Sequence, residues 1–370
     1  MTFKYKTKVG IFTKPIDQGT SGSGSHLRQL LNHVLEINDK FSITLIHYTK
    51  NDHEIYRKAQ ELIIPRNPLF AHFKLKKENF DILHYYPLTI FSPVWLKNPK
   101  KITTIHGGGA AELYFPTQFS KIKRFHAKFI KPLLFKRMDY FFIGSKAVKK
   151  FLTHQCNLKE ERIYFTHSAV DSDFKIFQKR PEKIKEKYGI TKPFIFHLSK
   201  FSERKNPWII LKAFHLIRKE KKDLTLILGG KGWKNKKVLD FAKKYKILKN
   251  IIFTGFIPRK DVIKLFNLAE IFLFPSFFEG FGMPNLEAMA CGCPVITSKA
   301  FAIPEIVGNA AILLENNSDP IELANKIVRL LEDDVLKNDL IKKGLERVKL
   351  YSWKKSAQIV LNIYEKSLEH

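Results

Sequence analysis

The most constraining feature of this 370-residue sequence is the segment 271–292, which predicts a strand, a glycine loop and a helix in succession. Apolar residues 271–274 indicate a buried strand. Gly280 and Gly282 follow, and glycine allows a ligand to approach the backbone closely. Pro284 suits the first turn of a helix. Because the first amides of a helix lack intrahelical partners and lie at the positive end of its dipole, the segment predicts an anion site.

Two carboxylates flank this predicted anion site, Glu279 in the loop and Glu287 in the first turns of the helix. Carboxylates repel phosphate but accept hydrogen bonds from hydroxyl groups. A diphosphate on the loop amides, with one sugar near each glutamate, would use all of these groups. The alternative interpretation is that Glu287 complements the helix dipole and Glu279 is a solvated loop residue.

The segment resembles the E-x7-E signature of family GT4, which comprises retaining glycosyltransferases of the GT-B fold. The resemblance continues through residues 294–298, 304–308 and 311–314. It implies that Glu279 contacts the donor sugar and that Glu287 contacts the ribose of the nucleotide. It also implies that three backbone amides lie near the sugar and the diphosphate, those of Phe281, Gly282 and Met283.

The alternation of apolar runs with helical or irregular segments predicts an α/β fold with parallel sheets. In the family context, we expect a GT-B architecture of two Rossmann-like, doubly wound domains that face a central cleft. We expect an acceptor-binding domain over residues 1–188, onto which a C-terminal helix 353–367 crosses back. Residues 189–352 are expected to form the domain that binds the nucleotide-sugar donor.

Two segments of the first predicted domain directly follow strands and contain candidate donor-binding residues. A loop rich in glycine and serine precedes a helix, and the resemblance implies that Gly22 or Gly24 faces the donor diphosphate. His106 comes directly after the strand 102–105, at the edge where open α/β sheets bind ligands. A lone histidine is usually structural, but the resemblance implies that His106 lines the donor-sugar pocket.

The second predicted domain begins with a strand that is followed by a basic loop. In isolation this loop is typical of a solvated surface. The resemblance implies that Lys205 neutralises the donor diphosphate, with Lys200 or Arg204 as the second cation. A further strand ends near Ile257, whose family counterpart presents backbone groups to the nucleobase.

The net charge of the chain is strongly positive, with 65 Lys and Arg residues against 35 Asp and Glu residues, or +30. This favours a polyanionic partner, either nucleic acid or an anionic membrane surface, unless the lysines are simply solvated. No nucleic-acid recognition motif is present, so we expect no nucleic-acid partner. No apolar run is long enough to span a membrane, and no signal peptide is apparent, so we expect a cytoplasmic location.

Residues 119–137 combine apolar residues at helical spacing with many lysines and no acidic residue. Pro132 is expected to kink or interrupt this helix. A basic amphipathic helix suits an anionic membrane surface, whereas the alternative is that its apolar stripe packs on the domain core. The candidate membrane or acceptor contacts are Lys121, Lys123, Arg124, Phe125, Lys128 and Phe129.

The resemblance to family GT4 implies a retaining, metal-independent glycosyltransferase, with Glu279, His106 and Lys205 as catalytic residues and no cofactor. The expected donor is a nucleotide-diphospho-sugar, with UDP favoured, that carries a hexose or an N-acetylhexosamine. The expected acceptor is a lipid or lipid-linked glycan at the inner face of the cell membrane. One alternative is a soluble sugar or sugar phosphate as acceptor, with GDP-mannose or a UDP-sugar as donor. Others are a sugar-nucleotide epimerase and a basic nucleic-acid- or membrane-binding protein with an inactive GT-B fold.

Overall fold

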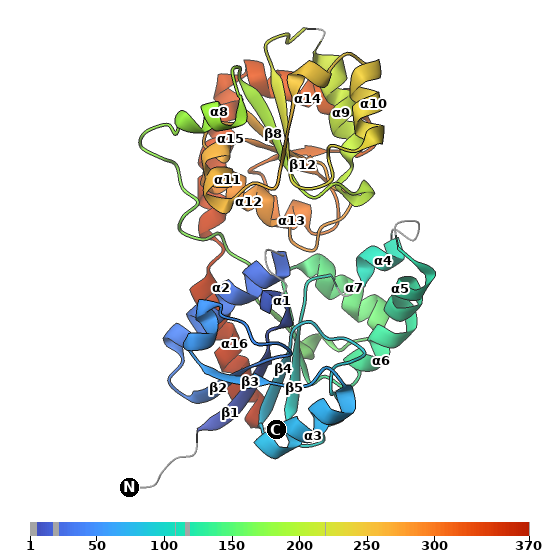
Figure 1. The fold of residues 1–370 in the computed structure, drawn as a ribbon, viewed down its shortest axis with the longest axis vertical. Coiled ribbons are helices and arrows are strands. Elements are labelled where there is room, and N and C mark those ends of the chain that lie inside the picture. Colours follow the sequence, from blue (N-terminus) through green and yellow to red (C-terminus); the bar gives the residue numbers. More distant parts are fainter. Residues whose placement is uncertain (1–5, 18–21, 108, 115–118, 219, 370) are drawn as a thin grey trace. The chain divides into compact units, whose positions relative to one another are not determined.

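The computed structural model describes residues 6–17, 22–107, 109–114, 119–218 and 220–369. The chain divides into two compact units, each built around a parallel sheet with helices on its faces (Figure 1). Unit 1 comprises Met1–Ser168 and Ser352–His370, and unit 2 comprises Ala169–Tyr351. The predicted α/β class with two doubly wound sheets is confirmed.

The sheet of unit 1 has seven strands in the order β3-β2-β1-β4-β5-β6-β7. All of its strand pairs are parallel. Its central strands are buried on both faces, as β4 illustrates, which explains their nearly continuous apolar sequences. The strands are β1 (Thr7–Phe12), β2 (Phe41–His47), β3 (Gln60–Ile63), β4 (Ile82–Tyr85), β5 (Lys100–Ile105), β6 (Tyr140–Ile143) and β7 (Ile163–Phe165).

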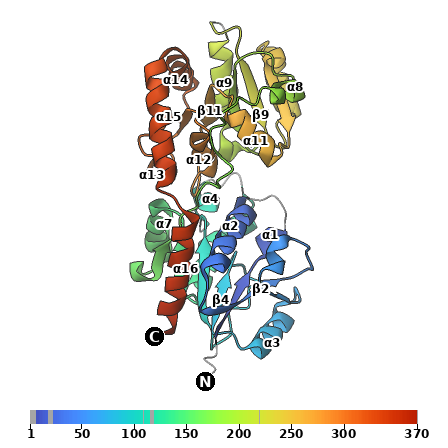
Figure 2. The same ribbon diagram turned by 90° about the vertical axis from the view of Figure 1, so that its left-hand side faces the viewer.

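The helices of unit 1 present apolar stripes to this sheet. In the longest crossover helix, Leu27, Leu30, Leu31 and Val34 are buried at helical spacing. The C-terminal helix lies against that helix (Figure 2). The helical elements are α1 (Lys14–Asp17), α2 (Gly22–Ile37), η1 (Glu54–Arg57), α3 (Pro68–Glu78), α4 (Ala110–Tyr114), α5 (Lys121–Phe125), η3 (His126–Ile130), α6 (Lys131–Phe135), α7 (Lys146–Cys156), η4 (Glu160–Arg162) and α16 (Trp353–Leu368).

The sheet of unit 2 has six strands in the order β10-β9-β8-β11-β12-β13, and its pairs are also parallel. The strands are β8 (Phe194–Leu198), β9 (Thr225–Gly229), β10 (Ile251–Gly255), β11 (Ile271–Phe274), β12 (Val295–Ser298) and β13 (Ile312–Leu314). The helical elements are α8 (Lys183–Tyr188), η5 (Glu203–Lys205), α9 (Pro207–Ile217), α10 (Lys236–Lys244), η6 (Leu248–Asn250), α11 (Arg259–Phe266), α12 (Met283–Ala290), α13 (Ile303–Val307), α14 (Pro320–Glu332) and α15 (Asp334–Lys349).

The boundary between the units falls at 168/169, earlier than the expected boundary at 188/189. The polar composition of the intervening segment predicted a linker, but its side chains pack on unit 2. The Phe174 ring lies 6.4 Å from the Phe266 ring. Tyr188 donates a hydrogen bond of 2.9 Å to Asp261. The segment is therefore a surface layer of unit 2 rather than a free linker.

Residues 121–135 are helical throughout, as α5, η3 and α6 in succession. Pro132 was expected to kink or interrupt the helix; it occupies the first turn of α6, directly after the π-helical turn η3, which interrupts the regular α-helical hydrogen bonding. Proline lacks an amide hydrogen and its ring clashes with the carbonyl of the preceding turn. The wider π-helical turn accommodates both effects without ending the helical path.

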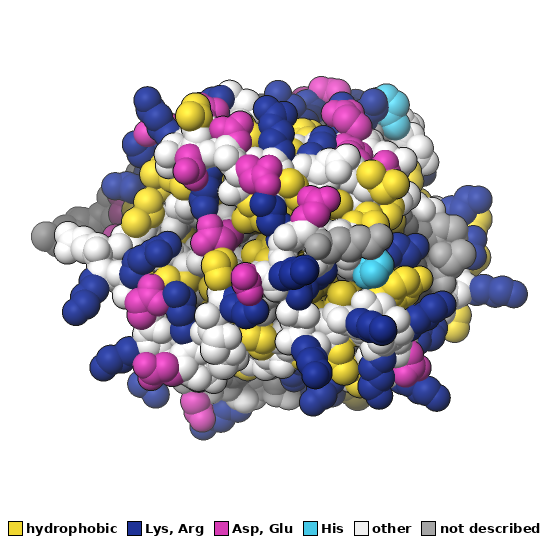
Figure 3. Space-filling view, turned by 90° about the horizontal axis from the view of Figure 1, so that it is seen from above, with side chains coloured by type: hydrophobic (Ala, Val, Ile, Leu, Met, Phe, Trp, Pro, Cys, Tyr) yellow, Lys and Arg dark blue, Asp and Glu magenta, His cyan; other side chains and the backbone are white. Residues whose placement is uncertain are grey.

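Positive charge is distributed widely over one face of the molecule (Figure 3). Figure 3 shows Lys and Arg side chains over much of the face that it draws, with Asp and Glu side chains between them. The net charge of +30 therefore does not mark out a single binding surface on that face.

Candidate functional site

The strand order of unit 2 reverses between β8 and β11, which are neighbours in the sheet. Open α/β sheets bind ligands at such a reversal, at the carboxyl ends of the strands. The loop after β8 carries Arg204 and Lys205, and the loop after β11 carries Glu279. Three of the predicted site residues therefore meet at the place where this topology favours a ligand.

Both cations converge on one oxygen of the Glu279 carboxylate. The Lys205 ammonium forms an ion pair with Glu279 Oε1, and Arg204 Nη1 lies 3.0 Å from the same oxygen. Arg204 Nη1 also donates to the carbonyl oxygen of Phe278 at 2.5 Å. The Lys205 ammonium lies 4.6 Å from the centre of the Phe274 ring. The side chains of Lys205 and Glu279 are only 14% and 13% exposed, so their attraction is screened little by solvent.

The ionisation of this cluster follows from burial and pairing. Burial acts to raise the pKa of Glu279, but Lys205 and Arg204 outweigh it and hold that pKa below its usual value. Burial lowers the pKa of Lys205, while Glu279 opposes this shift. The Glu279 carboxylate is therefore ionised and partly neutralises the cations that were predicted to hold a diphosphate.

Three backbone features fix the geometry of these loops. The Phe277 amide donates to the carbonyl oxygen of Arg204 at 2.9 Å, which ties the two loops together. Gly282 precedes α12 with a φ of +93°, a conformation that side chains rarely adopt. Gly230 allows the loop after β8 to pack closely on the backbone, because a Cβ at this position would lie 2.1 Å from the carbonyl oxygen of Ser199.

Glu287 lies in α12 and is partly buried. Burial raises its pKa to about 7, and the neighbouring Asp171 adds to this, while Arg259 opposes it. Arg259 forms an ion pair with Asp171 and lies over the Phe174 ring at 4.5 Å. The sequence analysis did not predict Arg259 as a site residue. Its position in the first turn of α11, directly after a strand and a proline, could have indicated it.

The remaining predicted site residues of unit 2 differ in whether their side chain or only their backbone can contact a ligand. The Phe281 side chain is buried, and its ring lies 5.5 Å from that of Tyr351, so only its backbone suits a ligand contact. Met283 begins α12, where helix amides are free of intrahelical partners. The Ile257 side chain is buried. Lys200 is exposed and forms no ion pair within the described residues, so Arg204 rather than Lys200 joins Lys205 at Glu279.

The sheet of unit 1 also reverses its strand order, between β1 and β4. Tyr86 follows β4, and its hydroxyl hydrogen-bonds to Nε2 of His106 and donates to the carbonyl oxygen of Ser23 at 3.3 Å. Gly22 and Gly24 lie in the first turn of α2, Gly22 exposed and Gly24 buried. Residues 18–21 of the predicted glycine loop lie outside the described residues.

Two histidines lie together at this edge of unit 1. The His26 ring packs edge-on against the His106 ring, with their centres 4.6 Å apart. His26 Nδ1 lies 2.6 Å from Ser168 Oγ, and its buried Nε2 has no hydrogen-bond partner within the described residues. Burial lowers the pKa of His106 to about 4, so both rings are neutral at physiological pH, His26 for the same reason. Because its Nε2 bonds to Tyr86, His106 offers a ligand its other ring nitrogen, Nδ1.

A cavity of 530 Å³ also opens at the carboxyl edge of the unit 1 sheet, and the sequence did not predict it. Its residues come from segments that follow β1, β2, β3 and β4, so only the folded sheet brings them together. It combines two cations, one carboxylate, three hydroxyls and two aromatic rings, a set that suits a polar, anionic ligand. The lining residues are Lys14, Asp17, Tyr48, Thr49, Arg66, Thr89 and Phe91.

The basic stretch exposes its apolar stripe instead of packing it on the core. Ile122, Phe125, Phe129 and Leu133 are 80%, 56%, 50% and 57% exposed, whereas Leu134 is buried. An open groove of 620 Å³ runs beside the helix. Its described lining residues include no carboxylate and are Leu113, Lys121, Arg124, Phe125, Lys128, Phe129 and Gln155. Lys123 lies in the same helical turn of α5.

No cluster of three or more His, Cys, Asp or Glu side chains able to hold a metal ion occurs within the part of the chain that the structure describes. None of its described helices is both long and apolar enough to cross a lipid bilayer.

Two family models match the chain, one in each half. The model for "Glycosyltransferase Family 4" matches residues 26–174, and the model for "Glycosyl transferases group 1" matches residues 180–347. The chain is 28% identical over 242 residues to the serotype-specific mannosyltransferase WbdA of Escherichia coli, a match that covers 64% of this chain and 30% of that protein. The chain therefore spans under a third of that longer relative.

A second relative is the N-acetyl-alpha-D-glucosaminyl L-malate synthase of Bacillus anthracis, 27% identical over 298 residues, with 77% of this chain and 74% of that protein covered. Among solved structures, Anabaena Alr3699/HepE in complex with UDP and glucose superposes with a TM-score of 0.78 over 97% of this chain and 100% of that one. At 17% identity, this likeness shows the fold, which is GT-B. The chain belongs to glycosyltransferase family GT4.

Proposed function

We propose that the protein is a retaining glycosyltransferase that transfers a hexose or an N-acetylhexosamine from a nucleotide-diphospho-sugar to an acceptor. The observation that carries this proposal is the cluster of Arg204, Lys205 and Glu279 at the strand-order reversal of unit 2. Two partly buried cations suit the charge that develops on a leaving diphosphate, and the carboxylate suits the hydroxyls of a sugar. Family membership and the malate synthase relative agree with this assignment.

In the proposed reaction, the bond between the anomeric carbon and the diphosphate oxygen breaks, and the acceptor oxygen bonds to the same face of the sugar. Lys205, Arg204 and the first amides of α12 neutralise the nucleoside diphosphate as it leaves. The leaving phosphate takes the proton of the acceptor hydroxyl. Glu279 orients the sugar, Glu287 holds the ribose, and His106 Nδ1 accepts a hydrogen bond from a sugar hydroxyl. These fixed cations and amides supply the electrostatic role that a metal ion has elsewhere, so we propose that the reaction needs no metal and no cofactor.

We favour a UDP-sugar as the donor, because the structural neighbour in complex with UDP and glucose shares the fold over nearly the whole chain. GDP-mannose is the main alternative, since the relative WbdA is a mannosyltransferase. A basic binding protein with an inactive fold is less compatible with the site, because both glutamates and Lys205 are present.

We propose a lipid or lipid-linked acceptor at the inner face of the cell membrane, which the protein meets as a peripheral protein. Support comes from the exposed stripe of Ile122, Phe125, Phe129 and Leu133, which lies among lysines. An amphipathic helix of this composition inserts its apolar side chains at the boundary of an anionic bilayer while its lysines meet the headgroups.

A soluble, anionic acceptor is the second candidate. The observation that favours it is the 530 Å³ cavity of unit 1, in which Lys14 and Arg66 accompany two aromatic rings. The name of the malate synthase relative also points to an anionic product for that enzyme. A sugar phosphate would suit such a cavity.

The deciding experiment is an assay of free nucleoside diphosphate released from UDP-glucose, UDP-N-acetylglucosamine and GDP-mannose, with and without EDTA. We expect slow hydrolysis of one donor that persists in EDTA and is lost in Glu279→Ala and Lys205→Ala variants. Lys236→Ala, on an exposed helix of the same unit, is the matched control and should keep wild-type activity. Failure of every donor to bind or turn over would refute the proposal, and inversion at the anomeric carbon of a transferred sugar would refute retention.

A further inference from the structure

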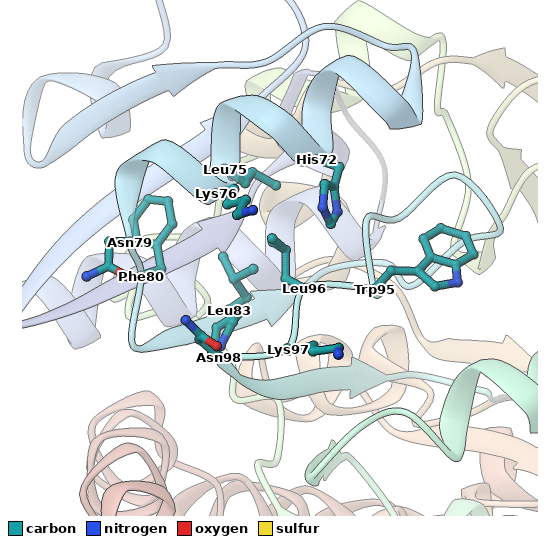
Figure 4. Close-up of a pocket in the computed structure, with 11 residues that line it drawn as sticks. His72, Leu75, Lys76, Asn79, Phe80, Leu83, Trp95, Leu96, Lys97 and Asn98 are labelled. Atoms are coloured by element: carbon teal, nitrogen blue, oxygen red, sulfur yellow. The ribbon is translucent and has the colours of Figure 1, made fainter.

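A cavity of 420 Å³ lies in unit 1 between α3 and the segment that leads into β5 (Figure 4). Its residues precede or begin β4 and β5, so it opens at the amino edge of the sheet, opposite the edge that carries His106. We call it the α3 pocket. Its lining consists of His72, Leu75, Lys76, Asn79, Phe80, Leu83, Trp95, Leu96, Lys97, Asn98 and Pro99.

The α3 pocket has an apolar floor and a cationic rim. The floor is formed by buried side chains that belong to the core: Leu75, Phe80, Leu83, Leu96 and Pro99. Exposed Lys76 and Lys97 stand on the rim, and no carboxylate is among the lining residues. In Figure 4, Lys76 and His72 come from α3, while Lys97 and Trp95 come from the segment across the cavity. Neither lysine forms an ion pair within the described residues, so both ammonium groups are available to an anion.

Exposed apolar side chains occur both in the lining of the α3 pocket and elsewhere on α3. Trp95 is 53% exposed, and on α3 Leu69, Phe70 and Phe73 are 61%, 62% and 54% exposed. The same helix buries Ala71 and Leu75 against the core. α3 is therefore apolar on two faces, whereas a surface helix normally presents polar residues to solvent. An exposed apolar patch of this kind marks a contact surface.

We propose that the α3 pocket binds one anionic lipid of a membrane surface. The lipid phosphate would pair with Lys76 and Lys97, and the start of its acyl chain would lie on the apolar floor. Trp95 would occupy the interfacial region of the bilayer, where amphipathic aromatic rings are favoured, and the exposed Phe73 would add an apolar contact there. Lysines suit this depth because their long apolar stems can lie in the interface while the ammonium groups reach the phosphates.

The charge and shape of the α3 pocket favour this occupant over two others. A second copy of this chain would bring another net charge of +30 to a cationic rim, which opposes self-association. A small soluble phosphate would pair with the lysines but would leave the exposed side chains of Trp95 and of Leu69 and Phe73 on α3 in water. A lipid with an anionic headgroup pairs with the lysines of the rim and also covers the apolar side chains.

The α3 pocket is separate from the basic stretch proposed above as a membrane contact, because α3 and the segment 95–99 share no residue with α5 and η3. It also does not depend on the transfer reaction. Loss of lipid binding would leave donor hydrolysis intact, and an absence of donor hydrolysis would leave lipid binding intact, so the two proposals can fail independently.

The first test is co-sedimentation of the full chain with vesicles of phosphatidylcholine alone and of phosphatidylcholine with phosphatidylglycerol. We expect Lys76→Gln/Lys97→Gln to weaken binding to the anionic vesicles about tenfold, since a lysine near an anionic surface contributes substantially to binding. Lys236→Gln/Lys237→Gln on α10 removes the same charge from exposed positions and should have little effect. Equal binding by the two double variants would overturn the proposal.

A second test locates the lipid. Phosphatidylcholine brominated on its acyl chains, mixed with phosphatidylglycerol, should quench part of the tryptophan fluorescence, and this quenching should disappear in Trp95→Phe. The remaining tryptophans, of which Trp233 and Trp353 are buried, provide the unquenched background. Quenching that persists unchanged in Trp95→Phe, or that is lost only in Phe125→Ser/Phe129→Ser, would place the lipid elsewhere and refute the α3 pocket.

A third test separates a lipid from a free phosphate. Calorimetry with monomeric short-chain phosphatidylglycerol should give one site that weakens in Lys76→Gln/Lys97→Gln, whereas glycerol phosphate should bind far more weakly. Comparable affinity for glycerol phosphate would show that the pocket takes a soluble anion, and no binding of the short-chain lipid would exclude a lipid pocket.

Discussion

At the scale of single residues, the Glu279 carboxylate both competes with the proposed donor for two cations and accepts hydrogen bonds from its sugar. It pairs with Lys205 and Arg204 in the ligand-free chain, and a diphosphate would need the same two cations. Binding of the donor therefore exchanges one anion for another at a fixed pair of positive charges. Because the carboxylate is 13% exposed, it must find new hydrogen-bond donors when the exchange occurs, and sugar hydroxyls are suitable donors.

We predict that Glu279→Gln binds free UDP more tightly than the wild type does but turns over the donor at least about a hundredfold more slowly. The substitution removes the competing negative charge while it also removes the group that orients the sugar. Calorimetry with UDP and the nucleotide-release assay measure the two effects. Lys205→Ala is the control, because it should weaken UDP binding. Weaker UDP binding in Glu279→Gln would contradict the competition.

A second residue-scale prediction concerns Glu287, whose pKa burial raises to about 7. Its unfolded value is lower, near 4.5, so between these values the folded state holds a proton that the unfolded state has released. The free energy of unfolding therefore falls as pH rises through this window. Glutamine does not titrate, so Glu287→Gln should gain thermal stability relative to the wild type as pH increases from about 5 to about 8. A difference in melting temperature that is constant with pH would show that Glu287 is not buried in this way.

At the scale of elements, the loop after β8 and the turn after β9 pack closely against each other. A residue with a side chain at Gly230 would block this contact. Gly230 has a φ of +111°, and a Cβ at this position would collide with the carbonyl oxygen of Ser199. The indole nitrogen of Trp233 donates to the same oxygen at 2.8 Å. The loop that leads to Arg204 and Lys205 thus rests on the turn after β9.

We predict that Gly230→Ala destabilises unit 2 by more than about 2 kcal/mol, because it combines backbone strain with a steric clash. Gly189→Ala is a matched control: Gly189 also has a positive φ of +64°, but a Cβ there meets no atom within 4 Å. It should cost about 1 kcal/mol. Chemical unfolding followed by fluorescence measures both, and equal costs would mean that the clash is relieved by movement of the loop.

The exposed stripe of α5, η3 and α6 supports another prediction at this scale. Phe125→Ser/Phe129→Ser should weaken binding to anionic vesicles, because it removes two large apolar side chains from the proposed interface. It should leave the melting temperature nearly unchanged, since both rings are at least half exposed. A marked fall in stability would show instead that the stripe packs against the protein.

Part of the fold and of the candidate site could be predicted from the sequence, and particular residues show why the remaining contacts could not. The segment 271–292 identified Glu279 and its helix, because strand, loop and helix are contiguous there. The ion pair with Lys205 joins residues 74 positions apart and depends on β8 lying beside β11, which the sequence pattern does not specify. The contact of Tyr86 with His106 depends in the same way on strand order. The spacing of Phe125 and Phe129 is the same for a buried and an exposed stripe, so periodicity left that choice open.

At the scale of the whole molecule, the two sheets share one order of strands. In each, the first strand lies between the second and the fourth, and the reversal occurs at the first strand. The proposed site residues of both units follow these central strands or their neighbours. A common topology thus gives each unit a ligand-binding edge, and in unit 2 two cations pair directly with one carboxylate there.

We predict that removal of residues 352–370 destabilises unit 1 and spares unit 2. α16 packs on α2, and the Tyr364 hydroxyl lies 2.7 Å from Nδ1 of buried His84. Its loss would expose the apolar face of α2 and leave a buried histidine without its partner. Limited proteolysis should then cleave unit 1 while a fragment that corresponds to 169–351 survives. Simultaneous digestion of both units would contradict the prediction.

The discontinuous make-up of unit 1 also has a consequence for biosynthesis. Its two segments, 1–168 and 352–370, are separated by the whole of unit 2, which is a single continuous segment. On the ribosome, residues 1–168 emerge first but must wait for α16, whereas unit 2 has all of its strands as soon as residue 351 leaves the tunnel. The half of the protein that is synthesised later is therefore expected to reach its native state earlier, and a chaperone would be needed most by the half that is synthesised first.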